Sequence, residues 1–112
     1  MKIDLPQGTL ETLVLKTLSW GPLHGYGIGR WIEKASGGTL VIEEGSMYPA
    51  LYRMEKRGWI AAEWRQTENN RRAKYYALTE DGRAQMKSAS RTWLTLVDSV
   101  GRVLYADGSA VA

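Results

Sequence analysis

The side chains best suited to chemistry in this 112-residue sequence are cations, and one segment holds their whole excess. From Arg53 to Lys74 there are seven lysines and arginines and three glutamates, a net charge of +4, whereas the rest of the chain carries −1. Cationic groups gathered on one surface attract polyanions, above all the phosphates of nucleic acids. The segment therefore predicts a nucleic-acid interface, with an ordinary solvated surface as the alternative.

Residues for catalysis or metal binding are scarce. The sequence has no cysteine and one histidine, His24, which excludes thiolate metal sites, cysteine nucleophiles and most histidine chemistry. No spacing pairs a serine or tyrosine nucleophile with a base. The run "GYGIGR" at residues 25–30 suggests a phosphate loop, but it is not G-x-G-x-x-G and no strand is predicted before it. We therefore expect no enzyme, metal or cofactor, and we interpret His24 as a turn residue.

The third of four predicted helices positions the first group of cations. If Gly45 or Ser46 is its N-cap, Pro49 falls in the first turn, where the missing N–H has no partner in any case. Gly58 ends the helix, and its apolar face consists of Met47, Leu51 and Met54. The predicted DNA contacts of this helix, which fits a major groove, are Ser46, Tyr48, Arg53, Lys56 and Arg57. The alternatives are a solvated amphipathic helix and, for Tyr48, a half-buried supporting role.

A predicted hairpin carries the remaining cations. Residues 60, 62 and 64 alternate to one side of a first strand, and residues 76 and 78 do so on its partner. Between them, Asn69 and Asn70 tolerate the left-handed conformation that a tight turn needs. The predicted phosphate or minor-groove contacts are Arg71, Arg72 and Lys74. A charged, solubilising loop is the alternative.

Two helices and a short strand are expected to support these elements. Apolar residues recur at helical spacing from residue 10 to 18 and again from 28 to 35, where Gly37 and Gly38 follow as a helix end. The run "TLVIE" at residues 39–43 predicts an edge strand. Gly27 and Gly29 each cost about 1 kcal/mol relative to alanine inside a helix, and we attribute their presence to close helix packing.

A long last helix, with Thr79 as its N-cap, completes the chain. About 26 residues would span roughly 39 Å, more than the width of so small a domain. Its apolar residues recur at intervals of three and four, a short heptad seam that a second copy would bury. The predicted dimer contacts are Met86, Ala89, Trp93, Leu96, Val97, Val100 and Val103.

The order of helix, helix, short strand, helix and hairpin describes a winged helix-turn-helix. The predicted fold is therefore mainly α with a small antiparallel β-hairpin, followed by a long C-terminal dimerisation helix. We divide the chain into a DNA-binding domain at residues 1–79, a dimerisation helix at 80–106 and a flexible tail at 107–112. With 44% apolar and 24% charged residues, no bilayer-spanning run and no apolar leader, the composition indicates a soluble, cytoplasmic protein without a membrane partner.

Four motifs follow one another within residues 5–93: "GTLETLVLKTL", "GPLHGYGI", "GSMYPALYRMEKRGWI" and "RRAKYYALTEDGR". In this order they resemble the PadR family of bacterial transcriptional regulators, specifically its short members with a single C-terminal helix. The resemblance implies a homodimeric repressor that binds double-stranded DNA at a palindromic operator. It also implies that the helix at 46–57 is the recognition helix, that the hairpin at 59–78 is the wing, and that the last helix dimerises.

The resemblance leaves two points open. Some relatives hold aromatic effectors between subunits, and Trp93 lies where such a pocket could form. The sequence departs from the family at Gly27, where a polar or acidic residue is common, and at Met47 and Met54, which replace leucines. The alternative function is a winged-helix dimer that binds an effector or a protein without reading DNA.

Overall fold

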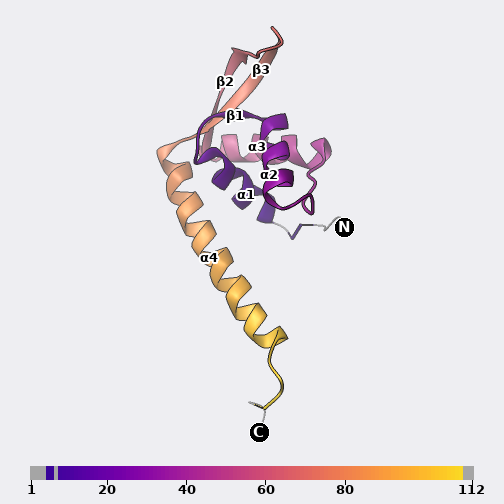
Figure 1. Cartoon of the computed structure of the whole chain (residues 1–112). Helices are drawn as coiled ribbons and strands as arrows, with labels where there is room; N and C mark the ends of the chain where they lie inside the picture. The colour runs from indigo at the N-terminus through magenta and orange to yellow at the C-terminus, as the bar shows by residue number, and fades with distance from the viewer. Residues whose placement is uncertain (1–4, 7, 110–112) are drawn as a thin grey trace.

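Three short helices and a small sheet form one end of the molecule, and a long helix extends away from it (Figure 1). The structure is a computed structural model that describes residues 5–6 and 8–109. The elements are α1 (Thr9–Leu18), β1 (Leu23–His24), α2 (Gly25–Ala35), α3 (Glu44–Lys56), β2 (Ile60–Gln66), β3 (Arg72–Leu78) and α4 (Glu80–Leu104). The predicted fold, mainly α with an antiparallel hairpin and a long last helix, is confirmed.

The sheet has the order β1-β3-β2, with both pairings antiparallel. The hairpin pairs Ile60 with Leu78 at its base and Gln66 with Arg72 near its tip. The edge strand predicted at residues 39–43 is wrong, because β1 occupies the free edge of β3 instead. Leu40 and Ile42 are partly buried against the core, so the apolar run there covers the core without pairing as a strand.

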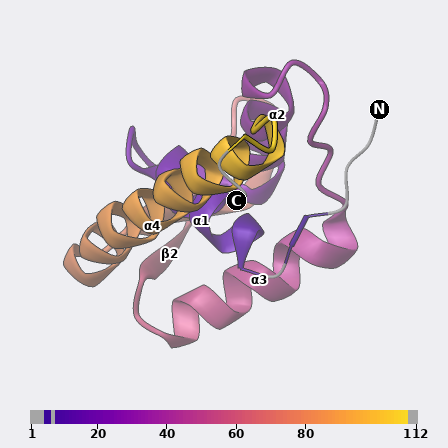
Figure 2. The same cartoon turned by 90° about the horizontal axis from the view of Figure 1, so that it is seen from below.

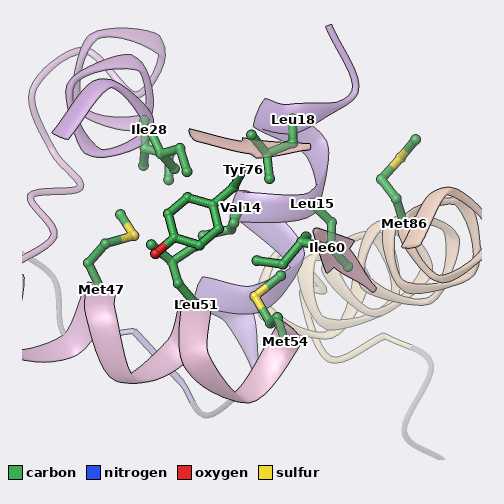
Figure 3. Close-up of a cluster of buried hydrophobic side chains, with 11 residues drawn as sticks. Val14, Leu15, Leu18, Ile28, Met47, Leu51, Met54, Ile60, Tyr76 and Met86 are labelled. Atoms are coloured by element: carbon green, nitrogen blue, oxygen red, sulfur yellow. The ribbon is translucent and has the colours of Figure 1, made fainter. Parts of the chain in front are cut away.

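The core lies between the helices and the base of the hairpin (Figure 3). Helix α1 is at its centre and contacts α2, α3, α4 and β3, and the view from below shows α3 and α4 on different sides of it (Figure 2). The buried cluster consists of Val14, Leu15, Leu18, Ile28, Ile32, Met47, Leu51, Met54, Ile60, Tyr76 and Met86. The apolar face predicted for the third helix is therefore confirmed.

Local signals set the ends of the helices. The Gly27 N–H donates to His24 Nδ1 at 2.9 Å, and the Gly82 N–H donates to Thr79 Oγ1 at 3.0 Å, so both side chains are N-caps. Gly58, with φ of 78°, follows α3 in the left-handed conformation that favours glycine. Asn70 has φ of 59° at the tip of the hairpin, as predicted.

Helix α3 begins earlier than the sequence suggested. Its first residue is Glu44, so Pro49 lies in the second turn and the prediction that it falls in the first turn is wrong. The backbone carbonyl of Glu43 accepts from Ser46 and Met47, which extends the helix toward the N-terminus. A proline at the sixth helical position removes the bond to the Gly45 carbonyl, yet the helix continues to Lys56.

Helix α4 packs on the core only through its first turns. Gly82 and Met86 are buried, whereas Leu96, Val97 and Val100 are each about half exposed, at 49%, 51% and 45%. The distal half projects into solvent and gives the molecule a long dimension of 64 Å (Figure 1). In the part of the chain that the structure describes, no helix is long and apolar enough to cross a membrane. Of the flexible tail predicted at residues 107–112, residues 107–109 follow α4 without regular structure, and residues 110–112 lie outside the described residues.

Candidate nucleic-acid interface

The orientation of α3 is fixed by its buried side, and its predicted DNA contacts are on the surface. Met47, Leu51 and Met54 are buried, and helical spacing turns the opposite side of α3 toward solvent. All five predicted residues are exposed: Ser46, Tyr48, Arg53, Lys56 and Arg57. They occupy two flanks of the helix, since Tyr48 faces the wing, whereas Ser46, Arg53 and Arg57 line a groove of about 910 Å³ beside α1 and α4.

Arg53 is held by an acid that sequence reasoning did not single out. Its Nη2 donates to Glu11 Oε1 of α1 at 2.8 Å. Burial alone would raise the pKa of Glu11, but the Arg53 hydrogen bond and the positive charges of Arg53 and Arg57 lower it overall. The guanidinium is therefore anchored at one edge, while half of the side chain, 51%, remains exposed.

Lys74 is also tied within the protein. Its Nζ donates to Glu55 Oε1 of α3 at 3.2 Å and lies 5.6 Å from the centre of the Tyr76 ring. This ion pair joins the wing to α3. The bond explains why Lys74, unlike the other predicted cations, is only partly exposed.

The two remaining predicted cations of α3 each lie over an aromatic ring. Lys56 Nζ lies 5.0 Å from the Tyr52 ring centre, and the Arg57 guanidinium lies 5.0 Å from that of Trp59. Within the described residues, neither cation forms an ion pair. Sequence reasoning missed Tyr52, which is 60% exposed on the outer side of α3, although its spacing off the apolar face was a usable signal.

The wing presents two further cations at its tip. Arg71 and Arg72 are exposed, and neither has an ion-pair partner among the residues that the structure describes. The Arg72 guanidinium lies 5.4 Å from the ring centre of Trp64, which is itself 57% exposed. The turn below them is closed by the Gln66 amide, which donates to Asn70 Oδ1 at 2.7 Å. The structure thus brings the wing cations to a defined, exposed tip.

A second concavity lies between the wing, the start of α2 and α3. It measures about 570 Å³, and we call it the wing trough; its lining includes Tyr26, Tyr48, Trp64, Arg71, Arg72 and Lys74. Tyr48 packs directly on Gly25, where an added Cβ would lie 2.8 Å from Tyr48 Cε1. Tyr48 is 47% exposed, so its ring supports the fold while its edge faces the trough.

The predicted dimer contacts follow one side of α4. Met86 is buried, Ala89 and Trp93 are half-buried, and the exposed members are Leu96, Val97, Val100 and Val103. The exposure of these side chains therefore increases along α4, from the core at Met86 to solvent at Val103. Exposed apolar side chains on one projecting helix are typical of a protein interface.

A winged-helix arrangement with cations on α3 and on the hairpin is therefore established, and a family comparison identifies its class. Residues 14–88 match the family described as "Transcriptional regulator PadR-like family". The chain belongs to this PadR-like family. The match contains all eight predicted DNA contacts but only Met86 of the predicted dimer contacts. Since PadR-like proteins are transcriptional regulators, the prediction that the chain is not an enzyme is confirmed.

Solved structures of PadR proteins share the fold. A PadR family transcriptional regulator from Eggerthella lenta is 31% identical with a TM-score of 0.74, over 90% of this chain and 86% of that one. A PadR-like transcriptional regulator from Bacillus cereus is 27% identical with a TM-score of 0.77, over 90% and 96%. An uncharacterized transposon protein from Streptomyces fradiae is 36% identical over 77% of this chain, which spans 23% of that protein's length.

Proposed function

We propose that this PadR-like regulator is a sequence-specific DNA-binding repressor that acts as a cytoplasmic homodimer on a palindromic operator. Residues 1–79 would bind DNA, and residues 80–106 would dimerise. The observation that carries the proposal is that α3 and the wing tip both present exposed cations: Lys56 and Arg57 from α3, and Arg71 and Arg72 from the wing.

The number of available cations sets the expected salt dependence. Lys56, Arg57, Arg71 and Arg72 have no ion-pair partner among the described residues, which gives four per subunit and about eight per dimer. Neutralising about six to ten phosphates lowers affinity by on the order of 10³ to 10⁵ between roughly 50 and 200 mM salt. Arg53 and Lys74 add to this only if DNA displaces Glu11 or Glu55.

The homodimer is supported by the unpartnered side of α4. A two-fold dimer needs a single self-complementary surface, and Leu96, Val100 and Val103 repeat along one such surface. Two recognition helices held about 34 Å apart enter successive major grooves, which requires an inverted repeat. Trp93 begins the exposed part of this seam, and we propose it as the contact for a planar aromatic effector in the dimer.

Selection of bound duplexes from a random DNA library tests the proposal. The purified protein should recover an inverted repeat with half-sites about one helical turn apart. Arg72→Ala should weaken binding to every sequence, because phosphate contacts carry no sequence information. Arg102→Ala is the matched control, since that arginine pairs with Asp98 on α4. Recovery of no sequence preference, or binding that is insensitive to salt, would refute the proposal.

Tryptophan fluorescence tests whether Trp93 contacts an aromatic effector. Planar aromatic compounds should quench the fluorescence of the dimer, and Trp93→Phe should remove that part of the signal. Trp20→Phe, which changes an exposed tryptophan outside the seam, serves as the comparison. Equal quenching in both variants would exclude Trp93 as the contact.

A further inference from the structure

One face of the hairpin packs on the core at its base and is exposed to solvent toward its tip. Ile60 and Tyr76 are buried at its base, and side chains two residues apart in a strand share one face. Trp64 and Lys74 are directly paired further along β2 and β3, and Arg72 pairs with Gln66 beyond them. These side chains therefore face the same direction as the core, but past its edge, where they form one wall of the wing trough.

The wing trough is lined by donors and holds no acid among the described residues that line it. The larger groove beside α1 differs, because Glu11 and Glu43 line it together with its cations. Indole N–H, guanidinium and ammonium groups only donate hydrogen bonds, and a phenol can donate one. The trough is therefore complementary to an anion, most strongly beside Arg71 and Arg72, because Lys74 is already paired with Glu55.

Three exposed aromatic rings accompany these donors: Tyr26, Tyr48 and Trp64 are 66%, 47% and 57% exposed. The stacking of Arg72 on Trp64 at 5.4 Å supports the guanidinium over an apolar surface. A ligand that suits this lining alternates anionic groups with apolar rings. The sugar–phosphate backbone of DNA does so, with phosphates separated by deoxyribose rings.

We infer that the wing trough binds the backbone of one DNA strand beside the major groove that α3 enters, with Tyr26 and Trp64 as contacts. The inference rests on the DNA binding proposed above and adds two residues to the eight predicted contacts. Tyr26 and Trp64 donate to phosphate oxygens from opposite walls, and their rings cover the intervening sugars. Arg71 and Arg72 supply the charge.

Two substitutions remove one donor each and keep a ring: Tyr26→Phe and Trp64→Phe. Each should weaken binding by about 10- to 150-fold, the effect of one hydrogen bond to a charged group. The loss should be equal for the selected operator and for unrelated duplex DNA, since phosphates are the same in both. The salt dependence should stay unchanged in both variants, whereas Arg72→Gln should reduce its slope by about 1.

The matched controls are Tyr105→Phe and Trp20→Phe, at side chains that are 92% and 63% exposed outside the trough. Thermal unfolding of every variant checks that the fold is kept. If the unmodified protein binds no duplex, the proposed function itself fails. If it binds, and the two trough variants bind as well as their controls, only the trough inference is overturned.

Neutral methylphosphonates, placed one at a time along the operator, locate the contacts. At a phosphate that Trp64 contacts, the methylphosphonate should weaken binding by the unmodified protein but should not weaken binding by Trp64→Phe any further. Such non-additivity is expected only for groups that touch. Additive losses at every phosphate would overturn the assignment of Trp64, and the same series with Tyr26→Phe tests the other wall.

Discussion

The ion pair between Arg53 and Glu11 makes a quantitative prediction for stability. The residues are 42 positions apart in the sequence, and their 2.8 Å contact joins α3 to α1. We predict that Glu11→Gln destabilises the folded protein by about 1 kcal/mol at neutral pH. This value lies between the roughly 0.2–1 kcal/mol of an exposed pair and the roughly 1.5–3 kcal/mol of a hydrogen bond to a charged group.

The intermediate value follows from the unequal exposure of the partners. The Glu11 side chain is 15% exposed, and that of Arg53 is 51% exposed, so water screens one side of the pair. Unfolding entropy of about 2.1 cal/mol/K per residue over 112 residues converts 1 kcal/mol into a fall in Tm of roughly 4 °C.

The effect should depend on pH with a defined sign. The folded-state pKa of Glu11 is lowered, because the hydrogen bond and charges of its arginine neighbours outweigh its burial. The stabilisation is therefore complete above the unfolded-state pKa of about 4.3 and is lost as pH falls through the lower folded-state pKa. Below that pH, the wild type and Glu11→Gln should be equally stable.

Urea unfolding at fixed protein concentration, repeated from neutral to acidic pH, measures this difference. Glu63→Gln is the matched control, because Glu63 pairs with Arg65 where both side chains are well exposed, at 69% and 46%; it should change stability by less than about 0.5 kcal/mol. A Glu11→Gln deficit that is the same at every pH would refute the electrostatic reasoning.

Three further substitutions test other contacts. Gly82→Ala should destabilise the protein by several kcal/mol, since the new Cβ would lie 1.8 Å from the Trp59 carbonyl oxygen. Gly101→Ala, with nothing within 4 Å, should instead stabilise it by up to about 1 kcal/mol and so raise Tm. Thermal unfolding measures both changes. Thr79→Ala should cost about 1 kcal/mol in urea unfolding, because the α4 cap is lost, and Thr79→Ser should retain the cap. Val100→Glu should yield monomers in sedimentation at micromolar concentration, while a dimer that survives it would contradict the proposed seam.

The elements that the sequence predicted correctly depend on local signals. Thr79 caps α4 through a residue three positions away, and Gly58 ends α3 through its own φ angle. Apolar spacing likewise predicted the buried face of α3, because a helix repeats within a few residues. The exposure of Arg71 and Arg72 followed from the turn that Asn70 forms.

The features that could not be predicted from the sequence depend on contacts between residues distant in the sequence. Strand β1 exists because Leu23 and His24 meet Tyr76 and Tyr75, more than 50 positions later, and two residues carry no strand pattern of their own. The ion pairs of Arg53 and Lys74 are equally invisible, since charge alone does not say whether a cation faces DNA or an acid.

The wing trough combines residues from α2, α3 and the hairpin. No spacing along the chain relates Tyr26 to Trp64. The number of cations could be predicted from the sequence, whereas their division between anchored and available groups required the folded chain.

The close contact of Gly82 with the Trp59 carbonyl leaves α4 little freedom where it joins the winged helix. In the proposed dimer, α4 then acts as a lever about 37 Å long, from roughly 1.5 Å per residue. A tilt of about 5° at its base moves the far end by about 3 Å, close to the 3.4 Å between base pairs on one strand. A change of this size in how the two helices cross would shift the recognition helices by about one base step, so the operator spacing depends on how firmly α1 and β3 hold the base of α4.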